Sequence, residues 1–379
     1  MRICLVYDCL YPHSVGGAER WYRNLAERLV AAGHEVDYVT LRQWPRGTDP
    51  GVSNVQVHAV GPRMGLYTDG RRRLAPPLVF GAGVLWHLLR NGRRYDVVHT
   101  ASFPYFSLLA AGLAVRPGGY RIVVDWHEVW SRDYWISYAG SLAGRVGWAV
   151  QRACARVGQR AFCFSRLHAE RLRDLGFPHE VSVLEGEYAG SLDRPPQTER
   201  EPVVMFAGRH IPEKRPTSLV RAFDVARRAL PELRLEIYGD GPDREKVLGL
   251  VSELELDDVA QVPGIVDGDV IESAFRRAAV HVLPSLREGY GLVVVEAAAA
   301  GTPSIVVQGL DNASTELIEE GVNGYVAASA EPEKLGAAIV KAIQAGEALR
   351  GSTADWFERN GHRLSIDTSL ETVVRSYET

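Results

Sequence analysis

Cysteine is scarce in this sequence of 379 residues. Cys4, Cys9, Cys154 and Cys163 form neither a C-x-x-C pair nor a spacing typical of metal ligands, which favours a reduced, cytoplasmic protein. Long apolar runs are missing too: no uncharged apolar stretch reaches about 18 residues, so we expect no segment to span a membrane. The apolar run in the opening MRICLVYDCL is too short for a signal peptide and predicts a first β-strand instead.

Charge of one sign is not in excess either. The formal net charge of −4 gives no reason to expect attraction to nucleic acid, so we expect no nucleic-acid partner. Neither half of the chain contains G-x-G-x-x-G with a following acidic residue, which disfavours a dehydrogenase.

Short β-branched runs alternate with segments of helical periodicity almost from end to end. Strands that are apolar on both faces and alternate with helices are typical of doubly wound parallel sheets, so an α/β fold is predicted. The expected strands of the first half are 2–7, 35–40, 55–60, 96–100, 121–125, 161–164 and 181–184. Those of the second half are 203–208, 234–239, 259–264, 280–284, 303–307 and 324–327.

A proline-rich, charged stretch at 185–202 interrupts the alternation and is interpreted as a linker. It divides the chain into two Rossmann-like domains, 1–187 and 188–360. The last segment, 361–379, has the apolar spacing of a terminal helix. In open α/β sheets ligands bind outside the carboxyl ends of the strands, so the loops that follow the strands are where we expect the chemistry.

Two such loops lie in the first domain. Gly16 and Gly17 precede a helix, where backbone N–H groups can meet an anion or a sugar hydroxyl, although a plain helix-start turn explains them equally well. Asp125, His127 and Glu128 end an apolar strand and are followed by several aromatic residues. His127 can accept a proton or bond a sugar hydroxyl, and the alternative is a histidine satisfied within an aromatic core.

Two further loops lie in the second domain. Arg209 and Lys214 follow its first strand and can neutralise a diphosphate, unless they form an ordinary solvated basic loop. Glu288 and Glu296 lie eight positions apart, around a loop and a helix N-terminus whose free N–H groups attract phosphate. We expect Glu296 to be buried and therefore in need of donors, which the hydroxyls of a ribose supply. A helix cap or a core salt bridge is the alternative for each glutamate.

Together these residues resemble the retaining glycosyltransferases of the GT-B fold, family 4 (glycosyl transferases group 1). The E-x7-E pair encloses EGYGL, follows VLPS and precedes EAAAAGTPSIV, and the Gly-Arg…Lys loop, D-W-H-E and GDGPDREKV (239–247) accompany it in order. The resemblance covers nearly the whole chain and is most specific in the second domain. It implies two Rossmann-like, doubly wound parallel-sheet domains that face a central cleft, with the C-terminal helix returning to the N-terminal, acceptor-binding domain.

The resemblance also implies a role for each candidate residue. Arg209 and Lys214 would hold the diphosphate of a nucleotide-sugar donor, and Glu296 would hold its ribose. Glu288 and His127 would bond the transferred sugar. The remaining donor contacts would come from Gly16, Gly17, the backbone near Ile265, and the segment Gly289, Tyr290, Gly291 and Leu292. No metal or other cofactor is expected, because no D-x-D motif ends a predicted strand and two basic side chains do the neutralising.

The implied reaction transfers a sugar from the donor to an acceptor hydroxyl with the anomeric configuration kept. Because no residue is a clear nucleophile, we favour a front-face route in which the leaving phosphate oxygen helps to deprotonate the acceptor. A nucleotide-sugar 2-epimerase of the same architecture, and a non-catalytic nucleotide-sugar binding module, are the alternatives.

No motif identifies the acceptor, and a small molecule, a glycan and a lipid-linked compound are all left open. The segment 69–94 has basic clusters on both sides of an apolar helix and fits either a peripheral contact with anionic lipid or a core helix with solvated ends. Contact with lipid would place the protein at the inner face of a membrane and suit a lipid-linked acceptor. Two departures from the family pattern leave roles open: Glu185 and Glu187 stand where Asn and Asp are expected, and the segment 308–318 lacks the usual Gly-Gly turn.

Overall fold

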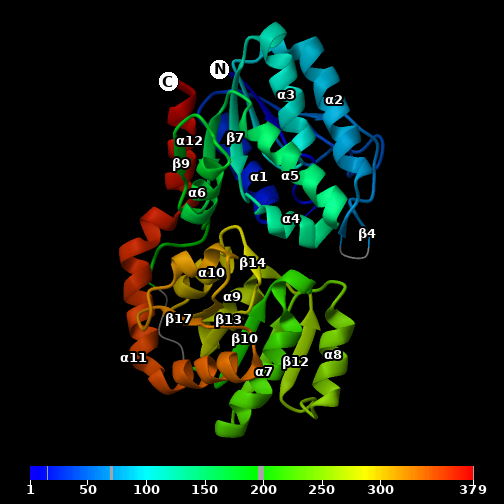
Figure 1. Cartoon of the computed structure of the whole chain (residues 1–379). Helices are drawn as coiled ribbons and strands as arrows, with labels where there is room; N and C mark the ends of the chain where they lie inside the picture. Colours follow the sequence, from blue (N-terminus) through cyan, green and yellow to red (C-terminus); the bar gives the residue numbers. More distant parts are fainter. Residues whose placement is uncertain (15, 69–70, 195–199, 379) are drawn as a thin grey trace. The chain divides into compact units, whose positions relative to one another are not determined.

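The computed structural model describes residues 1–14, 16–68, 71–194 and 200–378 (Figure 1). It divides into two compact units, one formed by Met1–Glu185 with Ser369–Thr379 and the other by Gly186–Thr368. The chain thus leaves the first unit at residue 185 and rejoins it at residue 369. The central part of the expected linker, 195–199, lies outside the described residues.

The first unit is built on a parallel sheet of seven strands in the order β3-β2-β1-β6-β7-β8-β9. Its strands are rich in Val, Ile and Ala and are largely buried on both faces, as a sheet covered by helices on both sides requires. Their bounds are β1 Arg2–Val6, β2 Glu35–Thr40, β3 Gln56–Ala59, β6 Val97–Ala101, β7 Arg121–Trp126, β8 Arg160–Cys163 and β9 Val181–Val183.

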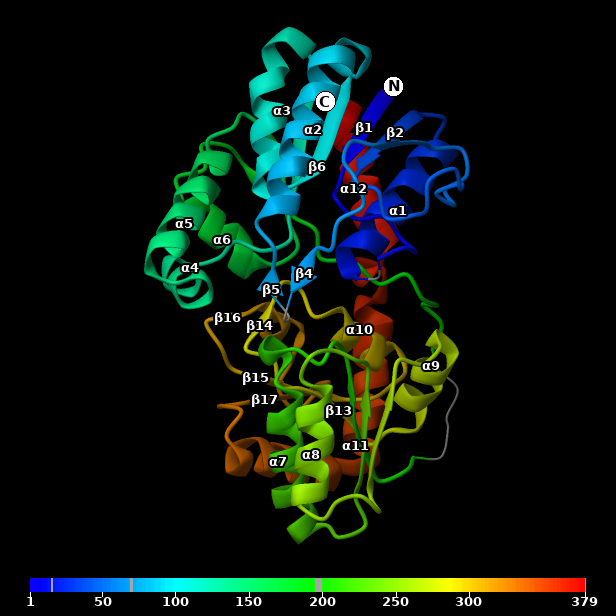
Figure 2. The same cartoon turned by 90° about the vertical axis from the view of Figure 1, so that its right-hand side faces the viewer.

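Helices cover both faces of this sheet (Figure 2). One face bears α2 Ala75–Asn91, α3 Tyr105–Gly118 and α5 Ser141–Ala155, which share a hydrophobic core with alternate strand residues such as Val6, Val98 and Val124. The other face bears α1 Gly17–Ala31 and the terminal helix α12 Ile366–Glu378. The unit also contains α4 Arg132–Ala139, α6 Arg166–Asp174, the 3-10 turn η1 Gly92–Arg94, and a small hairpin of β4 Tyr67–Thr68 and β5 Arg71–Arg72.

The second unit is built on a parallel sheet of six strands in the order β12-β11-β10-β13-β15-β17. Their bounds are β10 Val203–Ala207, β11 Arg234–Tyr238, β12 Ala260–Gly264, β13 Val280–Leu283, β15 Ser304–Val307 and β17 Gly324–Ala327. A separate pair of two-residue strands, β14 Arg287–Glu288 and β16 Asp311–Asn312, lies beyond the end of β13 in the chain.

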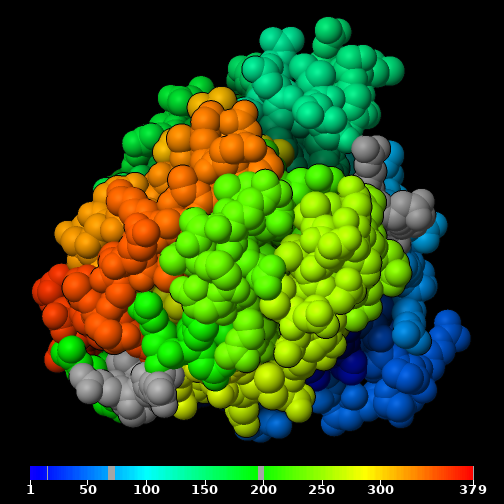
Figure 3. All heavy atoms as spheres, turned by 90° about the horizontal axis from the view of Figure 1, so that it is seen from below, coloured from blue at the N-terminus to red at the C-terminus, as the bar shows by residue number. Residues whose placement is uncertain are grey.

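Five helices accompany this sheet in the described ranges: α7 Pro216–Ala229, α8 Arg244–Glu253, α9 Gly268–Arg277, α10 Leu292–Ala299 and α11 Pro332–Leu364. Short 3-10 turns occur at η2 Pro212–Lys214 and η3 Ala313–Leu317. α11 bends at Gly346, whose φ of 60° is not helical. α7 packs against both α8 and α11, and these three helices lie side by side on the surface that Figure 3 shows.

The predicted α/β fold is confirmed. Every strand expected from the sequence is present, with its ends within one residue of the expected positions. The strands that sequence reasoning missed, β4, β5, β14 and β16, have two residues each, too few to show a periodicity. The terminal helix was expected over 361–379, whereas the helix break falls at Ser365 because the second half of α11 extends to Leu364. Of the helices that the structure describes, none is both long and apolar enough to cross a bilayer.

The strand orders locate the switch points of the two sheets. In the first sheet the order reverses between β1 and β6, and in the second it reverses between β10 and β13. Ligands of doubly wound sheets bind outside the carboxyl ends of the strands at such points. In the second unit we therefore expect a ligand to bind at the loops that follow β10 and β13.

Candidate active site

The loop after β10 is held by backbone contacts with the loop after β11. Gly208 N–H donates to Tyr238 O at 3.1 Å, and His210 N–H donates to Asp240 O at 2.8 Å. Gly239 has a φ of 113°, and a Cβ there would lie 2.0 Å from Gly208 O. The GDG turn at 239–241 thus lets the two loops approach closely, which fixes the segment that carries Arg209 and Lys214. Arg209 is exposed.

Lys214 and Glu288 are brought together by the structure. Lys214 Nζ lies 2.5 Å from Glu288 Oε1, and Ser285 Oγ donates to the same oxygen at 2.6 Å. Glu288 is the buried member, with 7% of its surface exposed. The two elements that meet here, η2 and β14, follow β10 and β13, so the ion pair stands at the switch point of the second sheet.

Asn312 secures the strand that carries Glu288. It is buried in β16, pairs with Glu288 through the parallel β14–β16 register, and donates from Nδ2 to Ser285 O at 3.2 Å and Val307 O at 2.8 Å. Its Oδ1 accepts from Ser314 Oγ at 2.6 Å. The segment 308–318 lacks the family's Gly-Gly turn. It holds the strand of Glu288 in place through the hydrogen bonds of Asn312.

The N-terminus of α10 has the geometry of an anion site. Its N-cap, Gly291, has a φ of 104°, and a Cβ there would lie 2.6 Å from Ser314 Cβ. Only glycine adopts this left-handed turn without strain, and it starts the helix directly after Gly289 and Tyr290. No side chain caps the helix, so its first N–H groups remain available for phosphate oxygens.

The expected burial of Glu296 is wrong. Val294, Val295, Ala297 and Ala298 form the buried side of α10, whereas Glu296 is only partly buried. With 3.6 residues per turn, Glu296 shares the less buried stripe of the helix with Leu292 and Ala299. Of this pair, the carboxylate of Glu288 is therefore the buried one, and Glu296 is only partly buried.

His281 is a buried neighbour of Lys214 that the sequence did not indicate. It lies on β13 with no exposed surface, and its Nδ1 is 3.0 Å from Ser304 Oγ. Burial, together with the positive charge of Lys214, lowers the pKa of His281 to about 3. Ser285 and Asn312 were missed as well. Their only sequence signal is position: Ser285 comes two residues after β13 and Asn312 five residues after β15.

The loop after β12 begins at Gly264, whose φ is 86° and whose carbonyl accepts from Gly239 N–H at 2.8 Å. Ile265 follows with 80% of its surface exposed. An exposed apolar residue at a strand end is suited to contact with a flat heterocycle. Ile265 thus shares the sheet edge on which Arg209 lies.

In the first unit, Gly16 is the N-cap of α1 and Gly17 its first residue. A Cβ on Gly16 would lie 2.4 Å from Glu19 Oε2, whereas a Cβ on Gly17 would meet no atom within 4 Å. Ser14 Oγ donates to Glu19 Oε1 at 2.9 Å, so Glu19 already occupies part of the first turn. The helix start is open at Gly17.

His127 follows β7 and is partly buried. Its ring stacks on Phe164 with centroids 4.4 Å apart and meets the edge of Tyr22 at 6.5 Å. Burial lowers its pKa to about 4, against the raising effect of Asp125, so the ring is neutral at pH 7. A neutral imidazole can donate or accept a hydrogen bond to a sugar hydroxyl and is not a general acid at this pH.

Beyond His127, the chain forms a cluster of aromatic rings. Trp130 contacts Trp135, Tyr134 and Tyr138 with ring centroids 4.6 to 5.1 Å apart, and its Nε1 donates to Glu128 Oε2 at 2.6 Å. Trp135 is buried, whereas the other three rings are partly exposed. The aromatic residues after the D-W-H-E motif are thus both core and surface.

Glu185 pairs with Arg166 at 3.6 Å in the first unit. Glu187 falls in the second unit and is partly buried. Among the residues that the structure describes, no three His, Cys, Asp or Glu side chains are grouped so that they could hold a metal ion.

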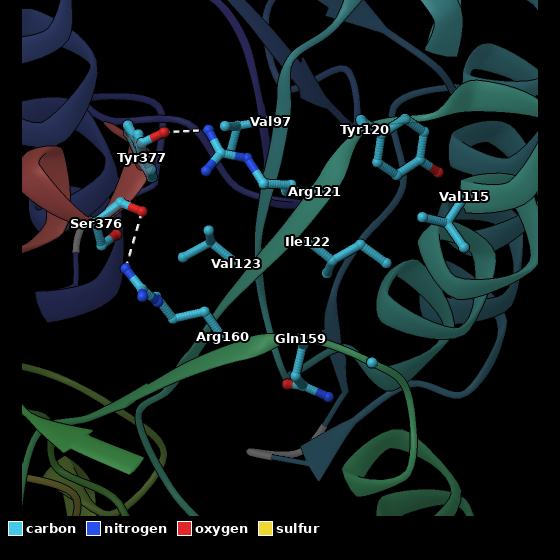
Figure 4. Close-up of a pocket in the computed structure, with 11 residues that line it drawn as sticks. Val97, Val115, Tyr120, Arg121, Ile122, Val123, Gln159, Arg160, Ser376 and Tyr377 are labelled. Carbon is cyan, nitrogen blue, oxygen red and sulfur yellow. Dashed lines mark hydrogen bonds between the residues drawn. The ribbon is translucent and has the colours of Figure 1, made fainter. Parts of the chain in front are cut away.

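A pocket of about 310 Å³ lies at the opposite edge of the first sheet (Figure 4). It opens where β6, β7 and β8 begin, beside Val97, Arg121 and Arg160. Arg121 and Arg160 point to the backbone carbonyls of Tyr377 and Ser376, at the end of α12. The pocket lies at the amino ends of the strands, away from His127, and we do not assign the reaction to it.

The segment 69–94 contains α2, and its residues 69–70 lie outside the described part of the chain. One side of α2 is core, with Phe80, Val84 and Leu88 buried. The other side is apolar but exposed at Leu78, Trp86 and Leu89, and Arg90 stacks over the Trp86 ring at 3.8 Å. The expectation of a core helix with solvated ends therefore describes only one face of α2.

Known proteins share this architecture. Sucrose-phosphate synthase from Thermosynechococcus elongatus superposes with a TM-score of 0.78 at 21% identity, over 100% of this chain and 98% of that one. HepE from Anabaena, solved with UDP and glucose, superposes with a TM-score of 0.77 at 16% identity, over all of both chains. These similarities define the GT-B fold.

Both halves of the sequence also match family models. Residues 15–186 match Glycosyltransferase Family 4, and residues 192–355 match Glycosyl transferases group 1. Glycogen synthase of Mycobacterium tuberculosis is 28% identical over 90% of this chain and 86% of its own length. The protein is therefore a GT-B glycosyltransferase. It belongs to family 4, the glycosyl transferases of group 1.

Proposed function

We propose that this protein transfers a sugar from a nucleotide-diphosphate donor to an acceptor hydroxyl, with retention of the anomeric configuration and without a metal ion. The observation that carries the proposal is the Lys214–Glu288 pair, 2.5 Å apart at the switch point of the second sheet. A nucleotide sugar has a negatively charged diphosphate next to sugar hydroxyls. A site for it therefore needs a cation for the phosphate and, close by, a carboxylate that accepts from the hydroxyls.

The donor's diphosphate is bound by cations and backbone. Arg209 is exposed and offers a forked pair of N–H donors, and Lys214 supplies a point charge. The backbone N–H groups of Tyr290, Gly291 and Leu292 at the start of α10 complete the site. These groups stabilise the charge that develops on the leaving nucleoside diphosphate, which is the role a divalent cation has in other transferases.

The remaining contacts are with the ribose, the base and the transferred sugar of the donor. Glu296, partly buried on α10, accepts from the ribose hydroxyls, while the backbone at Ile265 meets the base. Glu288 accepts from a hydroxyl of the transferred sugar. His127, neutral at pH 7, hydrogen-bonds the same sugar, and Gly17 at the open start of α1 approaches the diphosphate or the acceptor.

Retention proceeds on one face of the sugar. The bond from the anomeric carbon to the phosphate oxygen breaks, the bond to the acceptor oxygen forms, and the acceptor proton passes to the leaving phosphate oxygen. Glu288 is tied to Lys214 and Ser285 through one oxygen, which suits a hydrogen-bonding role better than attack as a nucleophile. Detection of a covalent glycosyl-enzyme by mass spectrometry contradicts this route.

The acceptor is a glycan or a lipid-linked sugar, and the exposed side of α2 supports the second. Leu78, Trp86 and Leu89 form an apolar stripe beside Arg90 and Arg93, the pattern of a helix lying at an anionic bilayer surface. The protein then acts at the inner face of a membrane. Co-sedimentation with anionic vesicles tests this, and binding that survives Trp86→Ser with Leu89→Ser excludes α2 as the contact.

The donor is identified by a thermal-shift screen of nucleotide sugars, because a ligand that binds only the folded state raises the melting temperature. HepE was solved with UDP and glucose, so UDP-sugars come first. With the donor known, release of nucleotide diphosphate is measured with and without acceptor glycans. Release that requires an acceptor supports transfer. Acceptor-free conversion of the donor to its 2-epimer indicates the epimerase, and binding without any turnover indicates a binding module.

A further inference from the structure

A chain of buried polar contacts leads from the terminal helix to β7. Tyr377 Oη lies 2.5 Å from His99 Nδ1, and His99 Nε2 lies 2.9 Å from Asp125 Oδ1. Trp21 Nε1 donates to the second oxygen, Asp125 Oδ2, at 2.7 Å. Tyr377, His99 and Asp125 have no exposed surface, so water does not compete for these contacts.

The same groups surround His127. Asp125 and His127 are two positions apart at the end of β7 and therefore point to the same side of the sheet. The ring of His127 stacks on Phe164, which meets the Trp21 ring edge-on at 5.0 Å. The Tyr22 ring contacts both His99, at 5.9 Å, and His127, at 6.5 Å.

The two aromatic rings that contact His127, those of Phe164 and Tyr22, are thus each linked to the buried polar contacts of Tyr377, His99 and Asp125. Phe164 packs on Trp21, which is hydrogen-bonded to Asp125, and Tyr22 packs on His99. A hydroxyl that donates to Nδ1 of His99 leaves the ring proton on Nε2, which lies 2.9 Å from Asp125 Oδ1. Tyr377 then fixes the tautomer of His99, His99 orients the carboxylate of Asp125, and that carboxylate orients Trp21.

The packing of α12 on the sheet does not require the polar contacts between Tyr377, His99 and Asp125. Leu370 and Val373 of α12 are buried, and Arg121 and Arg160 already bond its last carbonyls (Figure 4). Burying a tyrosine hydroxyl, an imidazole and a carboxylate costs free energy, and apolar residues of similar size would hold the helix as well.

We propose that Tyr377, acting through His99 and Asp125, is a positioning residue for His127, so that the last turn of the chain sets the geometry of the sugar-binding histidine. The inference rests on the proposed role of His127 in transfer. Neither half of the sequence that matches a family model extends to Tyr377.

The experiment compares Tyr377→Phe with Val373→Ala in the full-length protein. Tyr377→Phe removes only the hydroxyl, and Val373→Ala removes buried apolar atoms from the same helix one turn earlier, with no change to the hydroxyl at His99 Nδ1. We expect Tyr377→Phe to lower kcat roughly tenfold, because small misplacements of a reacting geometry have large effects on rate. The Kd for UDP stays within about twofold. Val373→Ala leaves kcat within about twofold, although its Tm falls.

A double-mutant cycle with His127→Ala tests the coupling. If Tyr377 acts through His127, Tyr377→Phe has no further effect on kcat once His127 is gone. Equal losses of kcat in the two helix variants, or additive losses in the cycle, overturn the proposal.

A readout without turnover separates this inference from the proposed function. Nitrogen-15 NMR of the imidazoles reports the tautomers of His99 and His127 in the unliganded protein. We expect Tyr377→Phe, and not Val373→Ala, to shift the signals of both rings. Unchanged His127 signals contradict the inference. If His127→Ala leaves transfer intact while the signals shift as expected, the proposed role of His127 fails and the positioning network stands.

Discussion

Lys214 and Glu288, one from each of the loops that follow β10 and β13, form an ion pair with 2.5 Å between Nζ and Oε1. The two side chains that the family resemblance assigns to different parts of a donor, phosphate and sugar, are thus in contact. In the proposed donor complex, Lys214 is divided between the carboxylate and a phosphate oxygen. We therefore expect the pair to contribute to the stability of the second unit as well as to the proposed donor binding.

Removal of Lys214 is expected to destabilise the protein. Lys214→Ala leaves the carboxylate of Glu288, whose side chain is 8% exposed, without its cation, and we expect a loss of about 2 kcal/mol in the free energy of unfolding. The double variant Lys214→Ala, Glu288→Ala should recover part of this loss. Denaturant titration measures both, with Lys246→Ala as the control because Lys246 pairs with Asp243 at the same 2.5 Å but is 69% exposed. A control loss as large as that of Lys214→Ala contradicts the assignment.

Arg209→Ala should weaken donor binding without affecting stability. The side chain is exposed, so its removal costs the fold little, but a bidentate bond to phosphate is lost. We expect the Kd for UDP, measured by calorimetry, to rise roughly ten- to a hundredfold. Arg209→Lys should retain the positive charge and lose the bidentate pair of N–H donors, which gives a Kd between those of the wild type and Arg209→Ala. Arg221→Ala, on the exposed side of α7, is the matched control and should bind UDP normally.

Gly291→Ala tests the start of α10. Its φ of 104° and the Cβ position 2.6 Å from Ser314 Cβ force either the turn or η3 to move. We expect a lower Tm and a loss of UDP binding, since the N–H groups at the helix start lose their alignment. Gly249→Ala in α8 meets no atom within 4 Å and should stabilise the protein by about 0.5 kcal/mol. Normal UDP binding by Gly291→Ala excludes the helix start as the phosphate site.

Much of this architecture could be predicted from the sequence because most of the longer strands are short apolar runs rich in β-branched residues. Val203–Ala207 and Ser304–Val307 are examples, and burial on both faces leaves such runs no alternative packing. Loop chemistry was also visible where a charged residue directly follows such a run, as Arg209 does. The family resemblance, not the spacing, supplied the roles of these residues.

The burial of Glu288, which lies on β14, depends on the pairing of that strand with β16 and could not be predicted. The burial of Glu296 depends on which stripe of α10 faces the core. That stripe is set by contacts of Val294, Val295 and Ala298 with the rest of the unit, far from Glu296 in sequence. The contact of His99 with Tyr377 could not be predicted for the same reason, because Tyr377 is 278 positions away along the chain. Such contacts arise only from the tertiary packing of helices on the sheet.

Acid should destabilise the protein through its buried histidines. Burial lowers the pKa of His281 to about 3, whereas the unfolded chain titrates near 6.5. Below pH 6.5 the unfolded state binds a proton that the folded state does not, so stability is lost as pH falls from 6.5 toward 3. At pH 5 the loss from His281 is about 2 kcal/mol relative to pH 8. His281→Asn keeps an acceptor for Ser304 and should flatten the pH dependence of Tm by a corresponding amount. His362→Asn, at an exposed position, should keep the wild-type slope, and equal slopes for wild type and His281→Asn would rule out His281 as a source of the acid sensitivity.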